Sequence, residues 1–298
     1  MTRVHTFHVG SLRCHTLEAG RQRLDGGAMF GVVPKPLWSR RIPADDRNRI
    51  PLALRCLLVE HPDGLVLVDT GVGNKEDAKF KDIYGIENHG RAGPTMLEDA
   101  LAEAGFHPDD VAWVINTHLH FDHAGGNTFV LEGEGDSPRL AFPRATYVVQ
   151  RGELHFARHA NERTRGSYFA ANFDPVDRAG RWLLLDAGRE VLPGIAVMVT
   201  PGHVPYHQSV TVTDAGDTAL FLADLVPTSA HLPLPWIMAY DVEPLRTLET
   251  KRAVLAEAAA KGWRLVFEHD PSVAWGRASG GDGAGVVLEE VELVEQAG

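Results

Sequence analysis

The sequence predicts an α/β fold built in layers, and three observations support this prediction. Short apolar runs typical of β-strands outnumber the segments with helical periodicity. The helical segments fall between groups of strands, which is typical of helices that cover sheets. No internal repeat, proline-rich linker or abrupt change in composition marks a boundary. We therefore expect residues 1–298 to form a single domain.

The first half of the chain contains a strand pair, a helix and a further strand. Residues 52–60 (LALRCLLVE) and 65–69 (LVLVD) are apolar runs joined by the turn sequence HPDG, which predicts a hairpin. Apolar residues recur at helical spacing over residues 96–104 and stop at Gly105, which suits the end of a helix. Residues 111–116 (VAWVIN) then predict a short strand.

Strands dominate the second half as well. They are predicted at residues 195–200, 208–213, 218–223 and 264–268. A helix with one apolar face precedes the last of them and ends near Gly262. The glycine-rich run 276–285 (GRASGGDGAG) predicts an exposed flexible loop, and VVLEEVELV after it predicts an edge strand.

Composition and charge disfavour several classes of function. Hydrophobic residues make up 44% and charged residues 23%, which is typical of a globular protein. The formal net charge of −11 would repel a phosphate backbone, so we expect no nucleic-acid partner. No signal-peptide pattern and no apolar run of about 18 residues is present, so we expect a cytoplasmic protein without a membrane partner. Cys14 and Cys56 are expected to be buried free thiols.

Candidate metal ligands recur immediately after apolar strands. They are His118, His203, Asp224 and His269. Because packed strands hold their ends at fixed mutual positions, residues at such ends can converge on a metal ion with little slack. The sequence therefore predicts a metal site at the ends of several strands.

The run HLHFDH contains three histidines and an aspartate within six residues, which packing alone rarely requires. Residues two apart in an extended segment project to the same side, so His118 and His120 can hold one ion. Asp122 and His123, around the following turn, can reach a second ion. The Gly-Gly pair that comes next permits the tight backbone of such a turn. The ten histidines outside this run and the strand ends are expected to be non-ligands.

The types of ligand indicate the metal and its chemistry. Imidazole and carboxylate together suit zinc, with manganese, iron or cobalt as alternatives, and no cysteine neighbours the motifs. Histidine-carboxylate sites commonly leave a position open for water. Two divalent ions ~3.5–4 Å apart can share that water, lower its pKa and polarise a carbonyl or phosphoryl oxygen. This chemistry favours a hydrolase.

These motifs resemble those of the metallo-β-lactamase superfamily. The run THLHFDHAGG (117–126) is similar to its metal-binding motif, and VDTG (68–71), TPGH (200–203), AD (223–224) and EHD (268–270) follow in the order of its other motifs. The resemblance implies a four-layer αββα sandwich of two mixed sheets, with the site at one edge. It also implies that His118, His120 and His203 hold one ion, that Asp122, His123 and His269 hold the other, that Asp224 bridges both, and that Asp69 orients a ligand.

A closer resemblance implies a substrate. The segment DGGAMFGVVPKPLW (25–38) is similar to one in the YtnP-type quorum-quenching lactonases, and TPGHVPYHQS is similar to the pattern of the N-acyl homoserine lactonases. The implied reaction is the opening of a lactone ring, with Asp122 or Asp224 passing a proton to the leaving alkoxide. Those lactonases carry a tyrosine where this chain has Pro227. Tyr206, Tyr240 and His207 are the candidates to replace it, and the metal ions alone are the alternative.

Substrate contacts are expected from apolar side chains, because small-molecule pockets are mostly apolar. The candidates are Met29, Phe30, Trp38, Phe121, Tyr206, Trp236 and Ile237. The run GAMFGVVPKPLWSRR has turn residues rather than strand or helix periodicity, so we expect residues 25–50 to form a loop over the active site.

Several alternatives stay open on the sequence. The same metals serve hydrolases of other esters or of phosphotriesters, such as the methyl parathion hydrolase group. A mononuclear iron dioxygenase, a nuclease of the RNase Z kind and a non-catalytic metal-binding module are rivals from other classes. Acyl-chain preference and the native metal are not readable from the sequence. Dimers are common in the lactonase-like branch, so a homodimer is an alternative to a monomer.

Overall fold

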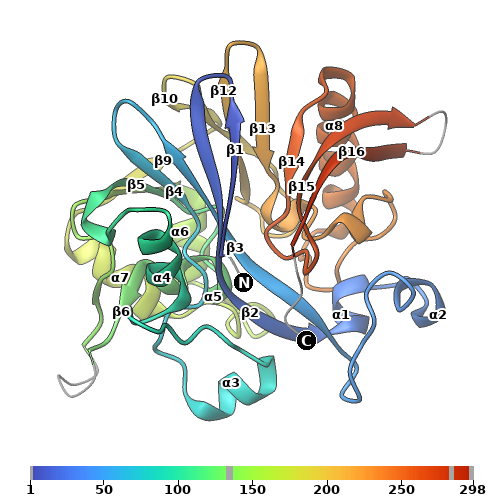
Figure 1. Ribbon diagram of the computed structural model, residues 1–298. Helices are drawn as coiled ribbons and strands as arrows, with labels where there is room; N and C mark the ends of the chain where they lie inside the picture. The colour runs from blue at the N-terminus through green and yellow to red at the C-terminus, as the bar shows by residue number, and fades with distance from the viewer. Residues whose placement is uncertain (1–2, 132–136, 282–284, 295–298) are drawn as a thin grey trace. The chain divides into compact units, whose positions relative to one another are not determined.

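The computed structural model describes residues 3–131, 137–281 and 285–294 (Figure 1). The chain divides into two compact units. Unit 1 consists of Gln22–Ala53 and the chain from Gly188 onward, and unit 2 consists of the chain up to Arg21 and Leu54–Ala187. The expectation of a single domain stays a prediction.

The first sheet has seven strands in the order β1-β2-β3-β4-β5-β8-β9. Their bounds are β1 Val4–Val9, β2 Leu12–Asp25, β3 Arg49–Glu60, β4 Leu65–Val68, β5 Val111–Ile115, β8 Thr146–Gln150 and β9 Trp182–Leu185. The pairs β1-β2 and β3-β4 are antiparallel, whereas β4, β5, β8 and β9 run parallel, so the sheet is mixed. Helix α4 (Met96–Glu103) buries Leu97 and Leu101 in one apolar cluster with residues of these strands, such as Leu67 and Val114.

The second sheet has seven strands in the order β10-β11-β12-β13-β14-β15-β16. Their bounds are β10 Arg189–Leu192, β11 Ile195–Val199, β12 Gln208–Asp214, β13 Asp217–Phe221, β14 Arg264–Val266, β15 Val273–Gly281 and β16 Gly285–Leu293. Only the β13-β14 pair is parallel, so this sheet is mixed too. Helix α8 (Pro244–Lys261) ends at Gly262 and packs Leu255 and Ala258 against the sheet beside the β15-β16 hairpin (Figure 1).

The remaining elements are short. The helices are α1 Gly26–Phe30, α2 Lys35–Trp38, α3 Ala78–Tyr84, α5 Phe121–Ala124, α6 Arg151–Arg158 and α7 Ala170–Arg178. The 3-10 turns are η1 Pro108–Asp110, η2 Gly125–Asn127, η3 Ala223–Leu225 and η4 Ser229–His231, and β6 Thr128–Phe129 pairs with β7 Arg139–Leu140. No helix within the described ranges is long and apolar enough to cross a membrane.

The structure confirms the predicted α/β class with two mixed sheets and flanking helices. Both cysteines are buried free thiols, as expected. One prediction was wrong: β15 continues through residues 276–281, where we expected a flexible loop. Gly276 serves close packing, since a Cβ there would press on Leu288 of β16. Residues 282–284, from the same predicted loop, lie outside the described residues.

Candidate metal centre

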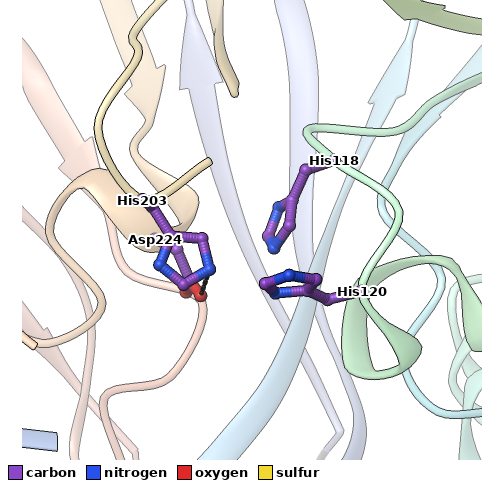
Figure 2. A group of neighbouring side chains, drawn as sticks. All are labelled: His118, His120, His203 and Asp224. Atoms are coloured by element: carbon purple, nitrogen blue, oxygen red, sulfur yellow. Dashed lines mark ion pairs between the residues drawn. The ribbon is translucent and has the colours of Figure 1, made fainter. Parts of the chain in front are cut away.

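The HLHFDH run lies where β5 ends and the short helix α5 begins, in unit 2. His118 and His120 precede the helix, and their ligand atoms lie within 4.8 Å of each other (Figure 2). Asp122 and His123 belong to α5, and their ligand atoms are equally close. All four side chains are buried. Unit 2 therefore holds two pairs of candidate metal ligands within one short stretch of chain.

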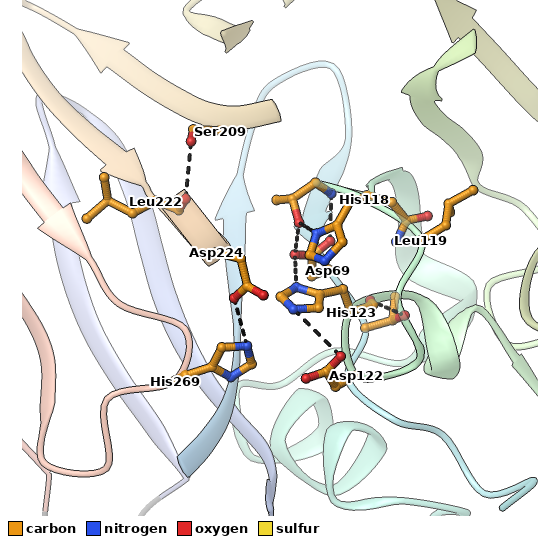
Figure 3. A network of polar contacts seen from close by, with 12 residues as sticks. Asp69, His118, Leu119, Asp122, His123, Ser209, Leu222, Asp224 and His269 are labelled. Atoms are coloured by element: carbon orange, nitrogen blue, oxygen red, sulfur yellow. Dashed lines mark hydrogen bonds and ion pairs between the residues drawn. The ribbon is translucent and has the colours of Figure 1, made fainter. Parts of the chain in front are cut away.

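Asp69, at the end of β4, anchors this turn (Figure 3). Its Oδ1 accepts the backbone N–H of Thr117 at 2.8 Å, and its Oδ2 accepts the Thr117 hydroxyl at 2.6 Å. The same Oδ2 lies 3.1 Å from Nδ1 of His123. Nδ1 of His118 lies 3.1 Å from Thr117 Oγ1, whose hydrogen is already given to Asp69. Both imidazoles therefore use Nδ1 as the donor, which leaves Nε2 as the ligand atom.

Positions 125 and 126 require glycine, because the backbone of the segment after β4 passes directly beside them. A Cβ at Gly125 would meet the carbonyl oxygen of Val72, and one at Gly126 would meet that of Thr70. The contact is hydrogen-bonded: Thr70 N–H donates to the His123 carbonyl at 2.7 Å, and Gly126 N–H donates to the Gly71 carbonyl at 3.0 Å. The chain after β4 and the ligand-bearing turn are thus held together by main-chain atoms.

Two residues that the sequence analysis did not single out, Glu153 and Tyr168, support the same turn. Glu153 Oε1 accepts the backbone N–H of Leu119 at 3.1 Å and the Tyr168 hydroxyl at 2.9 Å. The Tyr168 ring meets the His120 ring edge-on, with centroids 4.7 Å apart. Burial, with the nearby Glu153 carboxylate, raises the pKa of Tyr168. No local pattern predicts this pair, because Glu153 lies 34 positions from Leu119 and Tyr168 lies farther along the chain.

Unit 1 brings together His203, Asp224 and His269, each of which follows a strand of the second sheet. The Asp224 carboxylate lies between the two histidines: its Oδ2 is 3.0 Å from His203 Nε2, and its Oδ1 is 3.1 Å from His269 Nε2 (Figures 2 and 3). Pro227 contributes through its backbone, since its carbonyl accepts the N–H of His269 at 3.0 Å.

The opposite nitrogens of these rings also face acceptors. His203 Nδ1 lies 2.9 Å from Asp241 Oδ1, and His269 Nδ1 lies 2.8 Å from the Ala53 carbonyl oxygen. Because carboxylates and carbonyls only accept, each Nδ1 carries a hydrogen, and each Nε2 then faces the Asp224 carboxylate. That arrangement requires a positive charge, either a second proton on each ring or a shared cation. Divalent metal ions at the two Nε2 atoms, with Asp224 beside both, fit this donor set.

Three of the predicted substrate contacts are packed inside unit 1. Met29, Phe30 and Trp38 are buried in an apolar cluster with Ile50 and Leu52. The Phe30 ring stacks on Trp38 at 5.3 Å between centroids. The expected loop at residues 25–50 thus carries α1 and α2 and has a core of its own. The protein's own side chains account for the burial of these residues, and a role in substrate binding stays a prediction.

His231 holds this cluster in place. Its ring stacks on Phe30 with centroids 4.5 Å apart. Its Nε2–H donates to the Met29 carbonyl at 2.8 Å, and its Nδ1 accepts the Thr228 hydroxyl at 2.7 Å. Burial lowers the pKa of His231 to about 4, so the ring is neutral near pH 7. This histidine is a packing residue, as expected for a residue outside the ligand set.

The other candidates differ in exposure. Tyr206 is 44% exposed and Tyr240 is 38% exposed, whereas Trp236 and Ile237 are partly buried. His207 is buried, with Nδ1 2.8 Å from Thr200 Oγ1.

Phe121 is buried in an aromatic cluster of unit 2. Its ring lies 5.0 Å from Phe80, 5.4 Å from Tyr84 and 5.9 Å from Phe169. Burial raises the pKa of Tyr84, and the Asp122 carboxylate adds to this effect. The aromatic cluster is therefore close to a candidate metal ligand.

Known proteins resemble this chain in sequence and in fold. Residues 50–269 match the sequence profile of the Metallo-beta-lactamase superfamily. An N-acyl homoserine lactonase of a Bacillus species is 31% identical over 168 residues, and the match covers 55% of this chain but only 59% of that protein. The N-acyl homoserine lactonase AttM of Azorhizobium caulinodans is 30% identical over 241 residues, covering 73% of this chain and 81% of that protein.

A solved structure agrees over almost the whole chain. The crystal structure of a probable metal-dependent hydrolase from Staphylococcus aureus has a TM-score of 0.85 at 31% identity, covering 95% of this chain and 99% of that chain. The profile match covers well over half of the sequence and includes every strand end that carries a candidate ligand. The protein therefore belongs to the metallo-β-lactamase superfamily.

Proposed function

We propose that this protein is a dinuclear metallohydrolase that opens lactone rings, with N-acyl homoserine lactones as the favoured substrates. The observation that carries the proposal is the Asp224 carboxylate between two imidazoles, whose Nδ1 hydrogens are already given to Asp241 and Ala53. Such a carboxylate suits a bridge between two cations.

In the proposal, two metal ions share the seven candidate ligands. Unit 2 supplies His118 and His120 for one ion and Asp122 and His123 for the other. Unit 1 supplies His203 to the first ion, His269 to the second and Asp224 to both. Each ion would then have four protein ligands of histidine and carboxylate type, which favours zinc and leaves a position open for water. Manganese, iron and cobalt are the alternatives.

Two divalent ions in such a site supply a water of lowered pKa and polarise the carbonyl oxygen of a bound lactone. Neighbouring residues of the protein orient the metal ligands. All seven ligand side chains are buried, so the protein excludes bulk water from them. Asp122 and Asp224 are the catalytic groups of the proposal, because a carboxylate beside the reacting carbonyl can pass a proton to the leaving alkoxide.

The substrate class is supported by the relatives and by the surroundings of the site. Both curated relatives described above are N-acyl homoserine lactonases. The aromatic cluster of Phe80, Tyr84, Phe121 and Phe169 adjoins Asp122, and a lactone with an acyl chain needs an apolar surface of this kind. Other esters and phosphotriesters are the second candidate class, because the same ions polarise ester and phosphoryl oxygens.

The test combines metal analysis with a substrate panel. Metal content is measured by mass spectrometry, and turnover is measured on long- and short-chain acyl homoserine lactones, simple lactones, aryl esters and a phosphotriester. We expect two transition-metal ions per chain and the fastest turnover on acyl homoserine lactones. One iron per chain without hydrolysis would favour the dioxygenase reading, and two ions with turnover only of phosphotriesters or aryl esters would favour the second class.

Variants test the two proposed catalytic carboxylates. Asp122→Ala and Asp224→Ala should each lower kcat by about a hundredfold or more, because each loses a metal ligand and a proton carrier. Asp186→Ala is the matched control, since this aspartate pairs with Arg151 at the surface. Unchanged turnover in Asp122→Ala, with full metal content, would refute its role.

A further inference from the structure

Asp241 lies between the 3-10 turn η4 and helix α8, in the segment that leads into the helix. Its carboxylate is buried, and its Oδ1 lies 2.9 Å from Nδ1 of His203. Because a carboxylate only accepts, this contact keeps the hydrogen on Nδ1 and leaves Nε2 as the atom that can bind a metal.

The backbone around Asp241 is tied to the backbone around His203. The Val242 N–H donates to the His203 carbonyl at 3.0 Å, and the Glu243 N–H donates to the Gly202 carbonyl at 2.9 Å. Gly202 has a positive φ of 143°, and a Cβ there would collide with Thr247 of α8. The segment before α8 and the turn that carries His203 are therefore in close contact through main-chain atoms and through the Asp241 side chain.

A buried lysine, Lys251, also stabilises the loop that leads to Asp241. Lys251 of α8 donates from Nζ to the carbonyl oxygens of Pro233 and Trp236, each at 2.9 Å. Burial lowers the pKa of Lys251 to about 7, and the nearby Asp241 carboxylate opposes that shift. Lys251 thus fixes the loop that precedes Asp241.

We propose that Asp241 is a positioning residue for His203: it sets the tautomer and ring orientation of that histidine, so that Nε2 can bind a metal ion. The inference rests on the proposed metal site and adds a residue to it. Asp69 contacts Nδ1 of His123 in unit 2, and Asp241 contacts Nδ1 of His203 in unit 1. Each unit would then have one carboxylate that orients one histidine ligand.

The experiment compares the wild type with Asp241→Ala, Asp241→Asn and Asp217→Asn, all prepared as zinc-loaded protein. Asp217 is the control because it is a carboxylate of the same unit that pairs with Arg264 and Arg277 at the start of β13, whereas Asp224 follows the other end of that strand. Each protein is dialysed against a graded series of chelator concentrations, and bound zinc is measured by mass spectrometry, with circular dichroism as the check on folding.

We expect Asp241→Ala to lose one of its two zinc ions at a chelator concentration about 10- to 100-fold lower than the wild type. Asp241→Asn should fall between the two, because an amide oxygen still accepts the Nδ1 hydrogen but carries no charge. In the cobalt-substituted protein, the visible absorption of one ion should change in Asp241→Ala and be largely restored in Asp241→Asn. Asp217→Asn should retain zinc and spectrum as the wild type does.

The outcomes separate this inference from the proposed function. Wild-type affinity and an unchanged cobalt spectrum in both Asp241 variants would overturn the positioning role alone. A wild-type protein that binds no metal would overturn the proposed function and this inference with it. If Asp241→Ala fails to fold, Asp241→Asn decides, since it has the same shape as aspartate and a wild-type zinc affinity in it would contradict the proposal.

Discussion

Asp69 and His123 form a fully buried contact in which the carboxylate Oδ2 lies 3.1 Å from the imidazole Nδ1. The two residues are 54 positions apart, at the end of β4 and in α5. Asp69 also accepts two hydrogen bonds from Thr117. A single carboxylate therefore controls both the backbone before the HLHFDH run and the orientation of one of its histidines.

Removing the Asp69 carboxylate should weaken metal binding. Asp69→Ala leaves the Thr117 and His123 donors without their acceptor, so we expect metal affinity to fall about 10- to 100-fold, and Asp69→Asn should fall less. Retained zinc after dialysis against chelator measures the effect. Asp63→Ala, in the exposed turn of the β3-β4 hairpin, is the control. Zinc affinity in Asp69→Ala equal to the wild type would contradict the prediction.

A side chain at Gly126 should destabilise unit 2. Gly126→Ala places its Cβ against the Thr70 carbonyl, so the backbone must shift at a cost of about 1–3 kcal/mol. The midpoint of urea unfolding measures this cost. Gly166→Ala is the matched control, because a Cβ there has open space around it and the φ of Gly166 is not positive. Equal unfolding midpoints for the two variants would show that the contact with Thr70 is unimportant.

Replacing Phe30 tests whether this side chain serves core packing or substrate binding. Its side chain is 0% exposed and contacts Trp38, His231 and Trp236, so Phe30→Ala should lower the free energy of unfolding by about 3–5 kcal/mol. Val32→Ala is the control two residues away, at a side chain that is 93% exposed. If Phe30 instead serves only the substrate, KM will rise while the unfolding curve stays that of the wild type.

His231 should make the protein less stable in mild acid. The pKa of His231 is about 4 in the folded protein and about 6.5 in the unfolded chain, so only the unfolded chain gains a proton between these values. The stabilisation by the neutral ring is complete above pH 6.5 and is lost progressively as the pH falls to 4, by about 3 kcal/mol in total.

His231→Gln should remove this part of the pH dependence. The free energy of unfolding is measured in urea at pH 7, 5.5 and 4.5. Metal-free protein is used, because metal ions could dissociate in acid and change the stability. His107→Gln, at a side chain that is 74% exposed, should keep the wild-type slope. A wild-type slope in His231→Gln would contradict the assignment of this titration to His231.

Local patterns predicted most of the elements correctly. The apolar run that became β5 and the helical spacing that became α4 are properties of neighbouring residues, so they can be read without knowledge of the rest of the chain. The glycine-rich run after Val273 misled the prediction for the same reason. Its residues up to Gly281 pair with β16, and Gly276 packs closely against Leu288, but a local pattern does not reveal that partner strand.

The sequence by itself determined the α/β class, the hydrophobic strands and the concentration of histidines and aspartates at strand ends, because each depends on the order of residues along the chain. Which distant residues contact one another around these motifs and in the apolar cluster of unit 1 could be seen only in the folded chain. Asp241 meets His203 from 38 positions away, Glu153 meets Leu119 from 34, and Met29 receives a hydrogen bond from His231 across 202. Such pairs are set by the packing of sheets and helices, where distance along the chain no longer measures distance in space.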